Sequence, residues 1–84
     1  MVKFLLEWDV KPEYRKEAAK AVAEFKQPKD LKIIFPAHNC VASNRGLSIV
    51  EVDDIKVIQE MFAPMLDFVN INVTPVIPVF LESD

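Results

Sequence analysis

The spacing of hydrophobic residues along the chain changes from two to about 3.6 and back, which predicts alternating strands and helices. Residues 2–10 (VKFLLEWDV) place apolar side chains on every second position, at Phe4, Leu6, Trp8 and Val10. Residues 31–41 (LKIIFPAHNCV) and 46–52 (GLSIVEV) are rich in β-branched residues, and residues 68–80 return to alternation at Val69, Ile71 and Val73. We therefore predict four strands, with a turn formed by "ASNR" and Gly46 between the second and the third.

Two segments with helical spacing lie along the chain, one between the first and second predicted strands and one between the third and fourth. The first begins at Pro12, a favourable first helical position, and ends before Pro28; its apolar residues are Tyr14, Ala18, Ala21, Val22 and Phe25. Asp53 and Asp54 are suited to cap the second, whose apolar face contains Ile58, Met61, Phe62, Met65 and Leu66. Pro64 lies within that face, so we expect a kink or an end there.

The resulting order, β-α-β-β-α-β, is typical of a ferredoxin-like α+β fold, in which a four-stranded antiparallel sheet has the strand order 4-1-3-2. The prolines support this topology independently. Pro36 lies in the second strand, and Pro75 and Pro78 lie in the fourth. Proline cannot donate a hydrogen bond within a sheet, and this topology places exactly those two strands at the edges. We expect residues 1–84 to form one such domain.

Hydrophobic residues exceed what so small a domain can bury by itself. They make up 51% of the 84 residues, and the mean hydropathy is +0.15. The second strand is apolar on both parities, with Ile33, Phe35 and Ala37 alternating with Ile34, Pro36 and Cys40. Because the helices of this fold cover one sheet face, we expect the other face to pair with a second copy, giving a barrel-like homodimer, with higher oligomers left open.

Charge and cysteine content exclude several classes of function. Ten basic residues are scattered among thirteen acidic ones, for a net charge of -3, so no patch is suited to nucleic acid. The apolar runs are too short to span a membrane. A single cysteine and the lack of a signal-like N-terminus favour a reducing, cytoplasmic setting.

His38 is the main candidate for chemistry, because it is the chain's only histidine and the natural general base or metal ligand. The alternative is an ordinary edge-strand residue. Cys40 lies about 6.5 to 7 Å along the strand, too far for a direct hydrogen bond without a bulge, so we expect a buried apolar filler. His38 and Cys40 supply only two of the four ligands of a structural zinc; we expect no metal, although a metal carrier remains a third possibility.

Three further residues are candidates for ligand binding. Glu7 and Glu51 fall in the predicted central strands, where carboxylates are uncommon unless they face water or a polar cavity. Glu7 points away from the side of Trp8, which we assign to the core. Arg45 could bind a carboxylate, although a solvated turn residue is the alternative.

Several segments together resemble an uncharacterised family, a domain of unknown function, in the dimeric α+β barrel superfamily. They are KFLLEWDVKPEYR (residues 3–15), His38, RGLSIVEVDD (residues 45–54) and LDFVNINVTPV (residues 66–76). The resemblance implies a homodimer with a pocket between sheet and helices. Members of that superfamily include monooxygenases that need no cofactor, haem-degrading enzymes, small isomerases and stress-response proteins.

The sequence thus predicts a small dimeric protein that binds an organic ligand in a pocket near His38, lined also by Glu7, Glu51 and Arg45. Cofactor-free proton transfer or oxygenation is the expected chemistry if there is any, with His38 as the catalytic group and no cofactor. The alternative is a non-catalytic oligomerisation module without a ligand. The sequence leaves open whether the protein is an enzyme.

Overall fold

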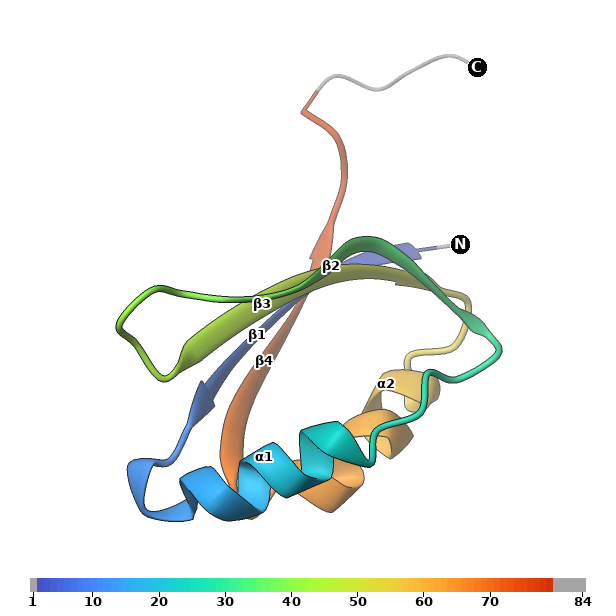
Figure 1. Cartoon of the computed structure of the whole chain (residues 1–84). Coiled ribbons are helices and arrows are strands. Elements are labelled where there is room, and N and C mark those ends of the chain that lie inside the picture. The colour runs from blue at the N-terminus through green and yellow to red at the C-terminus, as the bar shows by residue number, and fades with distance from the viewer. Residues whose placement is uncertain (1, 80–84) are drawn as a thin grey trace.

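A four-stranded antiparallel sheet carries two helices on one face in the computed structural model, which describes residues 2–79 (Figure 1). The strands are β1 (Val2–Val10), β2 (Leu31–Asn39), β3 (Arg45–Val52) and β4 (Val69–Val76), in the order β2-β3-β1-β4. The helices are α1 (Arg15–Ala23) and α2 (Lys56–Phe62), with short 3-10 turns at Pro12–Tyr14 and Ala63–Met65. Read from the other edge, this order is 4-1-3-2, which confirms the predicted ferredoxin-like α+β fold.

The edge strands are those that contain proline. Pro36 lies in β2 and Pro75 in β4, and each of these strands pairs with only one neighbour in the described sheet. The central strands β1 and β3 pair with each other from Val2 opposite Val52 to Asp9 opposite Arg45. Proline placement therefore supported the correct edge strands, although Pro78, which was predicted in the fourth strand, lies beyond the end of β4 at Val76.

The helices are shorter than predicted, but their ends lie near the expected signals. Pro12 begins a 3-10 turn, and α1 ends at Ala23, which leaves Phe25 beyond the helix. The second helix ends at Phe62, and Pro64 lies in the 3-10 turn that follows, as expected. The carboxylate of Asp54 accepts a hydrogen bond from the backbone N–H of Lys56 at 2.9 Å, which satisfies a free donor at the start of α2. None of the helices in residues 2–79 is long and apolar enough to cross a membrane.

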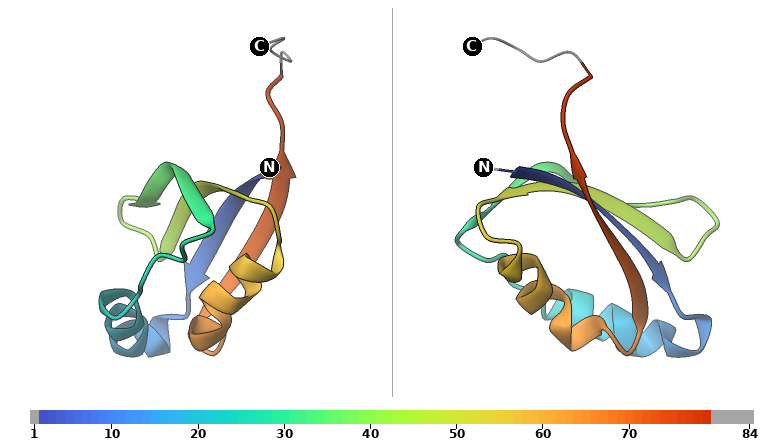
Figure 2. Two further views of the ribbon diagram at one scale, coloured as in Figure 1. Left: turned by 90° about the vertical axis from the view of Figure 1, so that its right-hand side faces the viewer. Right: turned by 180° about the vertical axis from the view of Figure 1, so that it is seen from behind.

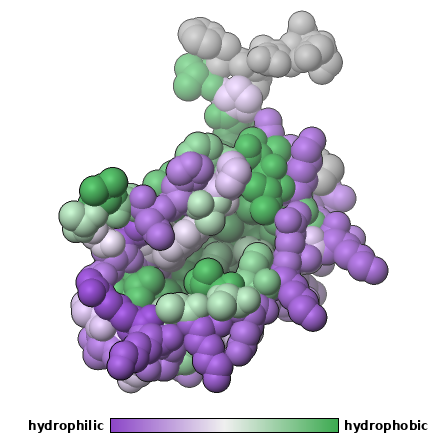
Figure 3. All heavy atoms as spheres, in the orientation of Figure 1, coloured by the Kyte–Doolittle hydropathy of each residue, from purple (hydrophilic) through white to green (hydrophobic). Residues whose placement is uncertain are grey.

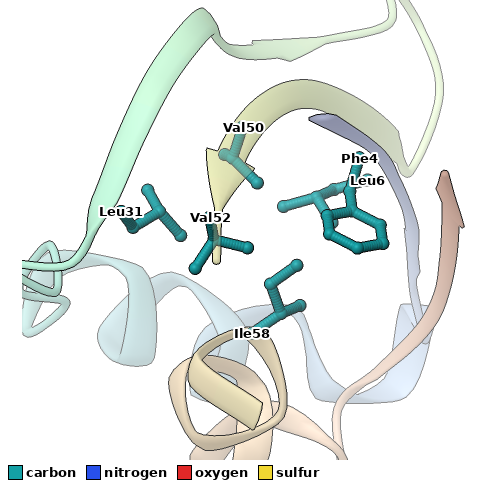
Figure 4. Packing of buried hydrophobic residues seen from close by; sticks show 6 residues of the cluster. All are labelled: Phe4, Leu6, Leu31, Val50, Val52 and Ile58. Atoms are coloured by element: carbon teal, nitrogen blue, oxygen red, sulfur yellow. The ribbon is translucent and has the colours of Figure 1, made fainter. Parts of the chain in front are cut away.

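The core lies between the sheet and α2. Ile58 is the buried residue of α2, and Figure 4 shows it pointing toward the side chains of the central strands. Six buried residues form this cluster: Phe4, Leu6, Leu31, Val50, Val52 and Ile58. A smaller cluster of Ala18, Met65 and Val69 joins α1 to the 3-10 turn after α2 and to β4. We call the sheet face that bears these residues the inner face, and the opposite one the outer face.

Arg45 and Gly46 both lie within strand β3, so the predicted turn, which included them, is wrong at its C-terminal end. The residue with a left-handed backbone in the turn is Ala42, at a φ of 55°. Gly46 pairs with Trp8 across the central strands, and a β-carbon at Gly46 would come within 2.6 Å of Cζ2 of the Trp8 indole. The glycine is needed because the indole ring lies against its backbone.

Strand β2 contains two irregularities, between Ile33 and Phe35 and between Phe35 and His38. Each added residue turns the following side chain to the other face. Ile33 is in register with Val50 on the inner face, whereas Phe35 is in register with Ile49 on the outer face. The predicted grouping of Phe35 with Ile33 on one face is therefore wrong, because it assumed an unbroken period of two.

Candidate functional site

A cavity of about 650 Å³ lies between the inner face of the sheet and the helices. All four strands and both helices contribute to its walls. Figure 3 shows the face of the molecule seen in Figure 1 as hollowed between sheet and helices, with mainly hydrophobic residues inside the hollow. We call it the inner cavity. Its volume is in the range of small-molecule sites, which span roughly 300 to 1,000 Å³.

Space for the cavity arises from the small side chains of α1. Ala18 and Ala19 line the cavity, and Ala18 is the buried residue of this helix. Whereas α2 inserts Ile58 into the core, the buried residue of α1 is Ala18, which contributes only a methyl group. Val22 and Phe25 also line the cavity and remain 64% and 41% exposed. The sheet and α1 therefore do not close on each other at the density typical of a protein interior.

The walls are mainly apolar and include flexible and aromatic side chains. Trp8 lies at the cavity with its ring 6.4 Å from that of Phe62, at an interplanar angle of 45°. Met61 and Met65 line the same wall. Methionine side chains adapt to irregular shapes, so this wall is suited to an organic ligand with an apolar body.

One end of the inner cavity is polar. There, the guanidinium of Arg15 donates from Nε and Nη2 to the Oδ1 atom of Asn44, at 3.2 and 2.8 Å. Asn44 lies in the turn between β2 and β3. Its backbone carbonyl oxygen accepts a hydrogen bond from the backbone N–H of Val10 at 2.8 Å. Asn39 and Ser43 line the same region. This end is therefore built where the β2–β3 turn meets the start of α1.

A further polar wall residue, Ser48, has its hydrogen bond within the protein. It is 5% exposed, and its hydroxyl donates to the carbonyl oxygen of Phe35 at 2.8 Å. This bond ties β3 to β2 at the irregular part of the sheet. The Arg15 end is thus the part of the cavity with donors to offer a ligand.

Glu7 and His38 lie on the outer face, away from the inner cavity. Each is in register with Leu47, from opposite sides, so the three residues form one row across β1, β3 and β2. Adjacent strands are about 4.8 Å apart, which puts the backbones of Glu7 and His38 about 10 Å apart. The structure brings these two predicted site residues onto one face but not into contact with each other.

His38 is exposed and held by its own strand. Its ring stacks on that of Phe35, with centroids 4.4 Å apart and an interplanar angle of 19°. Its Nδ1 atom lies 2.6 Å from the carbonyl oxygen of Pro36. Because a carbonyl only accepts, Nδ1 is the donor of this hydrogen bond, which leaves Nε2 as the ring atom that could accept a proton. This geometry suits a general base, and the catalytic role of His38 stays a prediction.

Glu51 and Arg45 lie elsewhere on the outer face, and each is in register with residues of opposite charge on the neighbouring strands. Glu51 is between Lys3 on β1 and Lys32 on β2, and Arg45 is opposite Asp9. Cross-strand pairs of this kind stabilise a sheet. Their positions have this structural explanation, and their predicted ligand binding is untested.

Cys40 is half-buried just after β2, and its backbone N–H donates to the carbonyl oxygen of Arg45 at 2.8 Å. Within residues 2–79, no group of three or more histidine, cysteine, aspartate or glutamate side chains could hold a metal ion.

Arg15 was missed as a candidate, although the sequence contains a signal for it. Arginine in the first turn of a helix is unfavourable toward the helix dipole by about 0.3 to 1 kcal/mol, which is a weak signal. The series Ala18, Ala19 and Ala21 is a second signal, because it leaves the helix face short of core-filling side chains. Trp8 was assigned to the core, and it both packs there and lines the cavity.

Both helices of residues 2–79 lie on the inner face of the sheet (Figure 2), so no described helix covers the apolar centre of the outer face. Leu5, Ile49 and Phe35 form one row in register across β1, β3 and β2, and Leu47 lies in the next row. Phe35 is 38% exposed, and the other three are half-buried. We call these four residues the outer patch.

One protein family matches nearly the whole chain. No curated protein and no solved structure shows significant similarity. Residues 2–80 match the family described as Domain of unknown function (DUF3303), a range that includes every strand and helix. The predicted membership of a family of unknown function is confirmed, whereas the dimeric α+β barrel superfamily stays a prediction. The chain belongs to the DUF3303 family.

Proposed function

We propose that the protein binds a small organic ligand in the inner cavity. The observation that supports this proposal is the cavity itself, about 650 Å³ of mainly apolar space between the sheet and an alanine-rich helix. Protein interiors are close-packed, and removing apolar surface from water is favourable by roughly 25 cal/mol for every Å². The apolar walls of an open cavity lack this stabilisation. An apolar occupant would recover that free energy.

The binding site has a built-in reporter, because the chain's only tryptophan, Trp8, lines it. The test uses N-phenyl-1-naphthylamine, an uncharged apolar probe whose emission rises in apolar surroundings. We expect saturable binding that quenches Trp8 and raises the probe's emission together.

A matched pair of variants on α1 locates the probe. Ala19 is exposed and lines the inner cavity, so Ala19→Phe fills the space without displacing a buried residue. Ala23, one turn further along α1, is also exposed and does not line the cavity. We expect Ala19→Phe to weaken probe binding at least tenfold and Ala23→Phe to leave it within twofold. Equal effects of the two variants, or no saturable binding to the parent protein, would refute the proposal.

We further propose that the outer patch joins two copies of the chain. This proposal is supported by the apolar row of Leu5, Ile49 and Phe35, which lies on the sheet face opposite the two described helices. Two such faces, stacked, would form the barrel-like dimer expected from the sequence. This dimer is also the core of the rival function, an assembly module without a ligand.

A second candidate function uses His38. In the proposed dimer the outer faces meet, so Nε2 of His38 and the carboxylate of Glu7 would face a space between two sheets, where cofactor-free proton transfer is chemically feasible. His38→Ala distinguishes the candidates. If the probe lies in the inner cavity, this variant leaves its affinity within twofold. A tenfold loss in His38→Ala, with no loss in Ala19→Phe, would favour the space between the sheets.

A further inference from the structure

We propose that the ligand of the inner cavity is an amphipathic organic acid, with a single carboxylate bound at Arg15 and an apolar body along α1. This inference rests on the proposed function, and it names the class of ligand. It is carried by the charge, the hydrogen-bond donors and the dimensions of the cavity.

Arg15 is the only charged residue among the described residues that line the inner cavity. One positive charge at the end of an otherwise uncharged, mainly apolar space favours one negative charge on the ligand. A dianion such as a phosphate monoester would leave a charge unbalanced, and a cation would meet repulsion. The charge therefore favours a monocarboxylate.

The groups at the polar end are oriented as donors. Arginine only donates, so the atom of Asn44 that faces Arg15 is its oxygen, and its amide nitrogen is left to donate elsewhere. Two of the five guanidinium N–H groups are used by Asn44, and no other partner of Arg15 is found within residues 2–79. The remaining N–H groups on Nη1 and Nη2 form a fork that matches the two oxygens of a carboxylate.

The apolar part of the cavity follows α1. The residues of α1 that line the cavity are spaced by three, one and three positions, which marks one face of the helix; they are Arg15 at the polar end, then Ala18, Ala19 and Val22. The nine residues of α1 are about 13.5 Å long at 1.5 Å each. Met61 and Leu31 line the part contributed by α2 and the start of β2. An extended chain of about ten carbons fits this length, with its acid group at Arg15.

The test compares two ten-carbon compounds that differ in their end group, decanoate and decanol. Each compound is titrated into the complex of the protein with N-phenyl-1-naphthylamine, and loss of probe emission measures displacement. Trp8 emission of the protein without probe measures binding directly. We expect both to displace the probe, with decanoate tighter by at least about fivefold, since a charged hydrogen bond adds to a shared apolar contribution. Decylamine, of opposite charge, should bind more weakly than decanol.

Two substitutions at Arg15 assign the preference to its guanidinium. Arg15→Gln removes the charge while keeping a donor toward Asn44, and we expect it to abolish the decanoate preference with decanol affinity within twofold. Arg15→Lys keeps the charge and should retain part of the preference. Circular dichroism checks that each variant is folded.

The outcomes separate the two claims. If neither the probe nor either compound binds, the proposed function fails. If decanoate and decanol bind equally, the cavity binds ligands but the acid class is wrong. A decanoate preference that survives in Arg15→Gln would overturn the role of Arg15. Equal losses for both compounds in Arg15→Gln would show that Arg15 only supports the fold.

Discussion

Trp8 and Gly46 are coupled at the centre of the sheet. The indole of Trp8 occupies the place of a side chain at Gly46, and the two residues are Cα partners of strands β1 and β3. The position of Trp8 in the wall of the inner cavity thus depends on a missing side chain on the neighbouring strand. A single glycine in 84 residues is used for this contact and not for the turn beside it.

We predict that Gly46→Ala lowers the free energy of unfolding by about 1 to 3 kcal/mol, because the new methyl group overlaps the indole. Trp8→Leu, a smaller side chain, should reduce that cost when both substitutions are combined. The measurement is urea unfolding of the parent, the two single variants and the double variant. Strictly additive effects would contradict a direct clash between these positions.

Ala42 presents the opposite case, a side chain where glycine is preferred. Its φ of 55° lies in the left-handed region, which costs an alanine about 1 to 2 kcal/mol. Ala42→Gly should therefore raise the free energy of unfolding by about 0.5 kcal/mol, the strain relieved less the greater freedom of glycine in the unfolded chain. The matched control, Ala19→Gly inside α1, should lower it by about 0.5 to 1 kcal/mol. If both substitutions lowered the free energy of unfolding, Ala42 would not be strained.

At the scale of elements, the two helices are attached to the sheet in different ways. The second helix is anchored by Ile58, which is 2% exposed within the main cluster, whereas α1 contributes Ala18 to the smaller one. Less apolar area therefore holds α1 to the sheet. The cavity is therefore on the side of α1. We expect the ligand to contact α1, the helix that is held to the sheet by less buried apolar area.

Ile58→Ala is predicted to lower the free energy of unfolding by about 2 to 5 kcal/mol, because it leaves a void among buried side chains. Ile55, just before α2, is 54% exposed, so Ile55→Ala should change stability by less than about 0.5 kcal/mol. Denaturant unfolding of both variants provides the comparison. Similar losses at the two isoleucines would show that α2 is not anchored as described.

The elements themselves were largely predictable from the sequence. Period-two alternation in β1 and proline in the edge strands are local signals, and both led to the correct topology. The bulges of β2 were not predictable, because the apolar residues of that strand satisfy either face. The role of Gly46 was equally hidden, since it depends on Trp8, 38 positions earlier in the chain.

At the scale of the whole molecule, the sheet separates two apolar surfaces with different expected occupants. The inner face forms the cavity, and the outer face carries the outer patch with Glu7 and His38 beside it. From the sequence, a pocket near His38 was expected either on the helix side or between two sheets, and the inner cavity lies on the helix side. The polar end of this cavity at Arg15 was not expected, because the contact of Arg15 with Asn44 joins residues that are 29 positions apart.

The proposed dimer gives a prediction for two isoleucines. Ile49 is at the centre of the outer patch, and Ile49→Lys should convert the dimer to a monomer by placing a charge in the interface. The same substitution at Ile55, exposed but outside the patch, should leave the dimer intact. Sedimentation equilibrium at micromolar concentration measures the mass of each. A monomeric parent protein, or dimers in both variants, would rule out this interface.

If the ligand occupies the inner face of the sheet, it contacts only one of two neighbouring residues on each central strand. Leu6 and Val50 line the inner cavity, whereas Leu5 and Ile49 belong to the outer patch. In methyl-labelled protein with bound N-phenyl-1-naphthylamine, we predict nuclear Overhauser contacts from the probe to the methyl groups of Leu6 and Val50. Contacts to Leu5 and Ile49 in their place would put the ligand on the outer face and refute binding in the inner cavity.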